Sequence, residues 1–231
     1  MDGRPTRDRI VEAATALLAT GGRDAVSTRA VSVAAGVQAP TIYRLFGDKQ
    51  GLLDAVAEHG FAEYLRSKTV RERDPDPVED LRRGWDLHVG FGLAQPSLYV
   101  LVYGELRPGV EPPAQREAAA VLAGMIRRIA EAGRLRVGEE RAAHLVHSAG
   151  RGITLTLMGM APERRDLTLS EQARESVISA VTTEGSVREV DDVGPAVAAV
   201  TLRALLPGLA VLTDAERGLL GEWLDRIADA G

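Results

Sequence analysis

The sequence predicts an all-α protein in which a small N-terminal three-helix domain precedes a larger helical bundle. Apolar residues recur at helical spacing along the chain, and no segment of useful length alternates as a strand would. The 231 residues are 45% apolar and 26% charged, a balance typical of globular proteins with a sizeable core. The stretch from Ser27 to Lys49 reads as two short helices joined by a tight glycine turn.

The first of these two helices is expected over residues 29–35. Ser27 or Thr28 can cap it, because a hydroxyl accepts a hydrogen bond from an otherwise unpaired backbone N–H group. Gly36 follows where the chain needs a left-handed residue, a conformation that glycine adopts without steric strain. These signals predict a helix, a turn and a second helix.

The second helix is expected from about Ala39 or Pro40 to Phe46, with Gly47 closing it; proline is tolerated in a first turn. Together the two helices have an apolar face that comprises Val31, Ala34, Ala35, Ile42, Leu45 and Phe46. The opposite face of the second helix has an amide, a hydroxyl, a guanidinium and, to the side, a phenol, from Gln38, Thr41, Arg44 and Tyr43. Such a helix can read base edges in a major groove, which indicates a helix-turn-helix.

Residues Thr6 to Leu53 resemble the DNA-binding domain of TetR/AcrR-type transcriptional regulators, over about a fifth of the chain. The run Thr41-Ile-Tyr-x-x-Phe-x-x-Lys, at its distance after Ala-x-Gly-Val, carries the resemblance. The family usually has His where this chain has Leu45, so we expect different packing there and retained DNA binding. The resemblance implies phosphate contacts from Thr28, Tyr43 and Lys49, and base contacts from Gln38, Ala39, Thr41 and Arg44.

The charge distribution agrees with an N-terminal DNA-binding domain. Residues 1–49 hold seven basic and five acidic residues, whereas the remaining 182 hold 21 basic and 28 acidic residues. A positively charged N-terminal segment followed by an acidic remainder fits a DNA-binding domain joined to a domain with another role. Arg4, Arg7 and Arg9, at the start of the first helix, either reach phosphates or lie in a solvated arm.

The three-helix domain, with the fourth helix that connects it to the rest, is expected to span residues 1–68, and the second domain to span residues 69–231. The first helix covers residues 6–20 and ends at a Gly-Gly pair; the fourth covers residues 48–68, with Asp48 as its cap. The N-terminus of the fourth helix can bind a phosphate, and its far end enters the second domain. Further helices are expected at residues 77–94, 96–106, 113–132, 139–160, 168–182, 195–206 and 214–229.

In the resembled family the second domain binds a small molecule and forms the dimer. The candidate ligand residues combine aromatic rings with a few polar groups: Trp85, His88, Phe91, Tyr99, Tyr103, His147, Arg151, Thr154 and Met158. The same residue types at helical spacing are more often core. Three glycines in the helix 139–160, Gly150, Gly152 and Gly159, suit a dimer seam or a pocket wall, because glycine permits close approach. We expect the dimer to use this helix and at least one later helix.

Several classes of protein are disfavoured. The chain has no cysteine, which fits a reducing cytoplasm. It shows no export signal, no membrane-spanning apolar run and no motif of a nucleophile elbow, zinc protease or phosphate loop. His144 and His147 lie three apart without a companion carboxylate, so we expect no metal, and no cofactor.

We therefore predict a cytoplasmic, homodimeric, ligand-responsive transcriptional regulator that binds double-stranded operator DNA and no membrane. The favoured version is a repressor, released from a near-palindromic operator by a small apolar or aromatic effector. A helical adaptor with vestigial DNA binding is the alternative, and an enzyme is the least favoured class. The sequence leaves an activator open as well.

Overall fold

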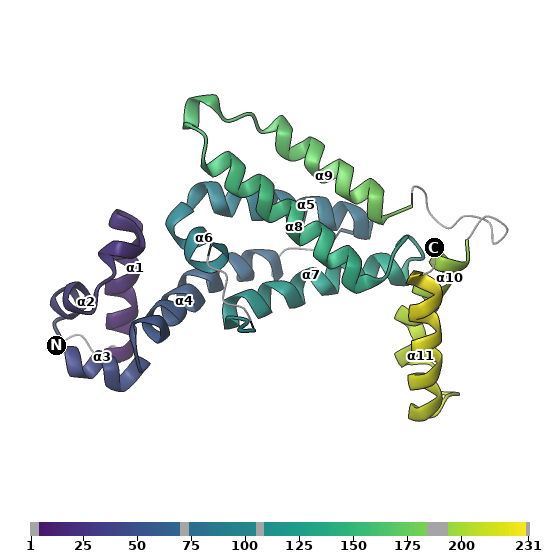
Figure 1. Ribbon diagram of the computed structural model, residues 1–231, viewed down its shortest axis with the longest axis horizontal. Coiled ribbons are helices and arrows are strands. Elements are labelled where there is room, and N and C mark those ends of the chain that lie inside the picture. The colour runs from purple at the N-terminus through teal and green to yellow at the C-terminus, as the bar shows by residue number, and fades with distance from the viewer. Residues whose placement is uncertain (1–4, 70–73, 105–108, 184–193, 230–231) are drawn as a thin grey trace. The chain divides into compact units, whose positions relative to one another are not determined.

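The computed structural model describes residues 5–69, 74–104, 109–183 and 194–229 (Figure 1). In these ranges the secondary structure is helical, apart from one isolated bridge between Leu135 and Thr182, so the predicted all-α class is confirmed. The α-helices are α1 Thr6–Ala25, α2 Thr28–Ala35, α3 Ala39–Phe46, α4 Lys49–Thr69, α5 Pro77–Ala94, α6 Pro96–Tyr103, α7 Pro113–Glu131, α8 Glu139–Met158, α9 Thr168–Val181, α10 Pro195–Leu205 and α11 Asp214–Asp229.

The chain forms two compact units. The N-terminal unit comprises residues 1–71 and 90–118, so the end of α5, all of α6 and the start of α7 group with α1–α4. The second unit comprises residues 72–89 and 119–231. The division into domains 1–68 and 69–231 remains a prediction.

The core of the N-terminal unit lies where α1 packs against α2, α4 and α6. Its buried apolar side chains recur three or four apart on α1 and α4, with one from each of α2 and α3, and they include Ile10, Ala14, Leu18, Val31, Ile42, Leu52, Leu53 and Val56. Burying the valine, leucine and isoleucine side chains stabilises the unit by about 1.5–3 kcal/mol each. The core therefore fixes α2, α3 and the start of α4 on one scaffold.

Four local expectations in this unit need correction. The first helix continues to Ala25 and does not end at residue 20, because the chain resumes a helical path after Gly22, which has φ 66° and ψ −166°. Ala34 is exposed and does not belong to the apolar face. Leu45 is 38% exposed, so the core covers it only in part. Of the predicted helix 96–106, α6 ends at Tyr103, and residues 105 and 106 lie outside the described ranges.

In the second unit, α8 and α9 lie side by side, and α10 and α11 form a hairpin (Figure 1). The start of α5 is tied to α9, because the indole N–H of Trp85 donates to the Ser170 hydroxyl at 3.0 Å. The Arg82 guanidinium also meets the Glu175 carboxylate, with three N–O distances of 2.9–3.1 Å. These bonds fix the position of α5 along α9.

Candidate nucleic-acid interface

The turn between α2 and α3 has the backbone that the sequence predicts. The Ser27 hydroxyl accepts the N–H of Ala30 at 3.1 Å, which caps α2. Gly36 adopts the left-handed conformation, with φ 63° and ψ 40°. The N–H groups of Gly36 and Val37 then donate to carbonyls of the last turn of α2 at 3.3 and 3.0 Å. This closed turn fixes the direction in which α3 leaves α2.

The second helix of the pair, α3, is anchored on one side and free on the other. Ile42 is 1% exposed and holds the helix on the core. Gln38 precedes the helix and accepts the N–H of Thr41 with its backbone carbonyl at 2.9 Å, while its side-chain amide makes no capping bond. Arg44 is exposed, and Tyr43 is 52% exposed. The outward face therefore presents an amide, a guanidinium and a phenol.

The remaining predicted DNA contacts are less uniformly placed. Lys49 is exposed at the first position of α4. Thr28, at the first position of α2, is half-buried, as are Ala39 and Thr41 of α3. Half-burial still leaves part of each side chain at the surface. These roles stay predictions.

The junction between α3 and α4 is tight for a reason that sequence analysis missed. Gly47 ends α3 with φ 80°. The Asp48 carboxylate then accepts the N–H of Gly51 at 2.8 Å, so Asp48 caps α4 as predicted. A Cβ atom at Gly51 would fall well inside 3.0 Å of the Phe46 carbonyl oxygen. Only glycine lets the first turn of α4 come so close to the end of α3.

Among the N-terminal arginines, Arg7 has a defined place. Its guanidinium carbon lies 5.3 Å from the centroid of the Phe46 ring, a cation–π arrangement at the end of α3. Arg9 is half-buried on α1, and Arg4 lies outside the described residues. Arg7 thus adds a positive charge at the end of α3.

Helix α4 connects this surface with an aromatic cluster in the same unit. Near its start, the amide of Gln50 accepts from Arg23 at 3.2 Å and donates to Asp54 at 3.0 Å, which ties α4 to α1. Farther along, α4 carries Phe61 and Tyr64. The same rigid helix therefore touches the recognition region at one end and the cluster beyond it.

The aromatic cluster consists of five buried rings from α4, α5 and α6, namely Phe61, Tyr64, Phe91, Tyr99 and Tyr103. Tyr64 stacks on Phe91 with centroids 4.3 Å apart, and Tyr99 lies 4.8 Å from Tyr103. Burial, followed by the neighbouring Tyr103 and Tyr99 hydroxyls, raises the pKa of Tyr64 far above its ordinary value. The Tyr64 phenol therefore stays protonated and can donate a hydrogen bond at any physiological pH.

The nine predicted ligand residues fall into two groups. Three of them, Phe91, Tyr99 and Tyr103, belong to the aromatic cluster of the N-terminal unit. The other six belong to the second unit and are Trp85, His88, His147, Arg151, Thr154 and Met158. Whether any of the nine contacts a ligand stays a prediction.

Within the second group, two α5 side chains face a glycine of α8. A Cβ atom at Gly150 would lie 3.5 Å from the Trp85 ring and 3.7 Å from the His88 ring. Thr154, which is fully buried, donates its hydroxyl hydrogen bond to the Gly150 carbonyl at 2.7 Å. Gly150 therefore lies against α5 of the same chain, at a distance where a Cβ atom would make ordinary van der Waals contacts.

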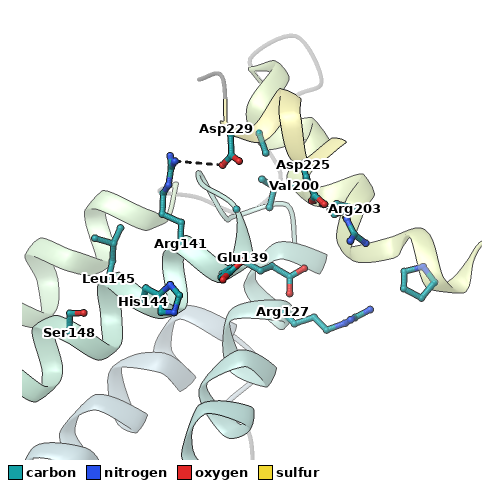
Figure 2. Close-up of a pocket in the computed structure, with 14 residues that line it drawn as sticks. Arg127, Glu139, Arg141, His144, Leu145, Ser148, Val200, Arg203, Asp225 and Asp229 are labelled. Atoms are coloured by element: carbon teal, nitrogen blue, oxygen red, sulfur yellow. Dashed lines mark hydrogen bonds and ion pairs between the residues drawn. The ribbon is translucent and has the colours of Figure 1, made fainter. Parts of the chain in front are cut away.

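A cleft of about 800 Å³ lies elsewhere in the second unit, between α7, α8, α10 and α11 (Figure 2). Its walls are strongly charged: Arg203 pairs with Asp225 at 3.0 Å, and Arg141 with Asp229 at 3.6 Å. Burial raises the pKa of Glu139, which lies among these charges. None of the nine predicted ligand residues lines this cleft.

The described part of the chain contains no group of three or more His, Asp or Glu residues placed to hold a metal ion. Within the same ranges, no helix has the length and apolar character needed to cross a membrane.

Comparison with known proteins links this geometry to a family. Residues 10–56 match the model of the bacterial regulatory proteins of the tetR family. Over 92 residues the chain is 34% identical to the uncharacterized HTH-type transcriptional regulator YvkB of Bacillus subtilis (strain 168). That alignment covers 40% of this chain and 45% of YvkB, so the chain matches less than half the length of this curated relative.

Solved structures extend the similarity over most of the chain. A protein of unknown function from Rhodococcus sp. RHA1 is 22% identical, with a TM-score of 0.66, over 79% of this chain and 98% of that one. A TetR family transcription regulator from Marinobacter aquaeolei VT8 is 22% identical, with a TM-score of 0.57, over 78% and 96% of the two chains. These similarities establish a shared fold.

Proposed function

Because the chain belongs to the tetR family of bacterial regulatory proteins, we propose that it is a ligand-responsive transcriptional regulator that binds specific DNA sequences. In this proposal it is a cytoplasmic homodimer and a repressor, which a small apolar or aromatic molecule releases from a near-palindromic operator. The family assignment favours a regulator over the adaptor and enzyme alternatives.

One observation carries the proposal: the outward face of α3 is exposed while its inner face is anchored by Ile42. A rigidly held helix with free polar side chains can enter a major groove without rearrangement. Gln38 suits adenine and Arg44 suits guanine, because each side chain can form two hydrogen bonds to one base. Each such pair discriminates against wrong bases by about 1–3 kcal/mol.

Phosphate contacts would position this helix. Lys49 is exposed at the N-terminus of α4, where free N–H groups and the helix dipole favour an anion. Tyr43 and Thr28 would add a phenol and a hydroxyl, and Arg7 holds a further positive charge beside Phe46. Such contacts strengthen binding to any duplex and make it depend on salt.

Release by a ligand would act through α4. This helix begins beside the recognition helix and carries Phe61 and Tyr64 of the aromatic cluster. A ligand that favours one tilt of α4 would change the spacing of the two recognition helices in a dimer. A preference of a few kcal/mol for the spread state is enough to release DNA.

The dimer would use α8 and at least one later helix. Leu145 and Leu155 of α8 are 44% and 36% exposed. Gly152, on the same helix, is exposed, and a Cβ atom there would meet nothing within 4 Å. An exposed helix face with large apolar residues beside a glycine suits close approach of a second copy.

A gel-shift titration against the DNA upstream of the protein's own gene tests the proposal. It is run at two salt concentrations beside a scrambled duplex of the same length. We expect selective binding of the upstream duplex, with affinity that falls steeply as salt rises. Equal binding to both duplexes over a range of candidate operators would contradict sequence-specific recognition.

A further inference from the structure

Helix α11 has an inner face that is fixed to the rest of its unit. Gly221 and Leu224 are buried there, and a Cβ atom at Gly221 would lie 3.3 Å from the Arg203 guanidinium of α10. The carboxylates of Asp225 and Asp229 point toward α10 and α8, where they pair with Arg203 and Arg141 (Figure 2). This face packs on α10 through Gly221 and, farther along, borders the charged cleft through Asp225 and Asp229.

The outer face of α11 is a stripe of three large apolar side chains. Leu219, Trp223 and Ile227 are 49%, 50% and 44% exposed. They follow one another at intervals of four, so they lie in one row along the helix, on the side away from Gly221 and Leu224. A single exposed leucine needs no explanation, but a contiguous row with a tryptophan at its centre marks an interaction surface.

Two opposite charges border one edge of this outer stripe. The helical period places Glu222 and Arg226 next to each other, one turn apart, beside Trp223. Arg226 donates only to the backbone carbonyl of Glu222, at 3.2 Å, among its described contacts. The Glu222 carboxylate has no hydrogen-bond or ion-pair partner within the described ranges. Both charged groups can therefore pair with another molecule.

We propose that the outer stripe of α11 binds the same stripe of a second copy, with the two helices antiparallel. In a two-fold pair, if residue i meets residue j, then j also meets i. Trp223 then lies at the axis, and Leu219 of one copy faces Ile227 of the other. The inference rests on the homodimer of the proposed function and names a surface for it.

The charges select a second copy over other occupants. In an antiparallel pair the same edge of each helix faces its equivalent, so Glu222 of one copy meets Arg226 of the other, twice. DNA or an anionic membrane would need a basic rim instead. Helix α11 holds five acidic and two basic residues, so it repels such surfaces.

Charge exchange along this edge tests the pairing. Glu222→Arg and Arg226→Glu each place like charges opposite one another in the pair, so each should raise the dimer dissociation constant roughly tenfold or more. The double variant restores both pairs and should return the constant to near that of the unchanged protein. An equimolar mixture of the two single variants should form the heterodimer in preference to either homodimer. Sedimentation velocity over a concentration series measures all four.

Tryptophan fluorescence gives a second readout. The chain has two tryptophans, so Trp85→Phe leaves Trp223 as the only indole. Its emission should shift to shorter wavelength as concentration rises and the pair forms. Trp223→Ala should weaken association, whereas Leu167→Ala removes a side chain that is 54% exposed outside the stripe and should not. Circular dichroism checks that each variant remains helical.

The outcomes separate this inference from the proposed function. If the unchanged protein is dimeric and binds DNA selectively, while both charge variants keep its dissociation constant, the α11 pairing is wrong and the regulator remains supported. If the charge exchange behaves as expected but no duplex is bound selectively, the pairing stands and the proposed function fails. Failure of the double variant to recover also overturns the pairing.

Discussion

The carbonyl oxygen of Phe46 lies well inside 3.0 Å of the position that a Cβ atom would occupy at Gly51. Phe46 is the last residue of α3, and Gly51 lies in the first turn of α4. The atom of Phe46 that lies so close belongs to the backbone. A methyl group at residue 51 therefore cannot be accommodated by the rotation of a side chain. The spacing of α3 and α4 depends on glycine at this site.

We therefore expect Gly51→Ala to destabilise the protein and weaken DNA binding. Alanine normally stabilises a helix interior relative to glycine by about 1 kcal/mol. Here the forced shift should reverse the sign, lowering the free energy of unfolding by about 1–3 kcal/mol. Chemical denaturation and gel-shift titration measure the two effects.

Gly124→Ala is the matched control, because Gly124 lies in α7 and a Cβ atom there meets nothing within 4 Å. This control should leave stability unchanged or raise it slightly. A Gly51→Ala variant that behaves like the control would show that α3 and α4 are not held by this contact.

Much of the recognition region could be predicted because its signals are local. Ser27, Gly36 and Gly47 each reveal a cap or a turn through their own chemistry, and all three take those roles. The close approach of Gly51 to Phe46 was not predicted, because it depends on the angle at which α4 follows α3. The signal in the sequence was a glycine three residues after the capping Asp48.

The second unit could be predicted less well, for a related reason. Its cleft draws residues from four helices that lie far apart in sequence, and periodicity does not reveal which helices become neighbours. Gly150 was expected to mark a dimer seam or a pocket wall, but its neighbour is the Trp85 ring of the same chain, at an ordinary contact distance of 3.5 Å from a Cβ atom. Helix periodicity identifies an inward face without identifying what that face meets.

Arg44→Ala should relax sequence preference more than it lowers overall affinity. Arg44 is exposed on α3, and its loss would remove the proposed bidentate base contact, which discriminates by about 1–3 kcal/mol. Titrations against operator variants with single base changes measure the preference at each position.

Tyr43→Phe and Arg164→Ala are its two controls. The first removes the proposed phosphate contact and should weaken binding to all duplexes alike, whereas the second removes an exposed arginine outside the N-terminal unit and should change nothing. Unchanged base preference in Arg44→Ala would exclude Arg44 as a base-reading residue.

Ser170→Ala should destabilise the second unit, because it removes the acceptor of a buried hydrogen bond and leaves the donor in place. The loss of the bond itself should cost more in this variant than in Trp85→Phe, which removes the donor. The Ser170 hydroxyl accepts the Trp85 indole N–H, and both side chains are buried. Without the hydroxyl, the indole N–H is buried without its partner, which costs about 1–3 kcal/mol. Denaturant unfolding measures the difference.

Trp85→Phe removes the donor as well as ring volume, so the double variant completes a cycle. The effects of the two substitutions should combine less than additively, because the hydrogen bond can be lost only once. Full additivity would indicate that the two groups do not interact in solution.

Stability should fall in acid partly through Glu175. The Arg82 guanidinium, and next Arg174, hold the pKa of Glu175 below its ordinary value of 4.5, against the opposing effect of burial. Because the folded pKa is lowered, the stabilising contribution is fully present above pH 4.5 and disappears as pH falls through the folded pKa. Glu175 is 46% exposed, so solvent screening limits the contribution to about 1 kcal/mol or less.

Glu175→Gln removes this titration while keeping the shape of the side chain. Thermal unfolding measured from pH 7 to pH 3 should show a difference between the variant and the unchanged protein that is largest near neutrality and shrinks in acid. Glu140→Gln, an exposed glutamate without a described ion pair, is the control and should follow the unchanged protein throughout. A Glu175→Gln difference that stays constant over this range would mean that the ion pair between α5 and α9 does not persist in solution, since protonation of an unpaired carboxylate is the same folded and unfolded.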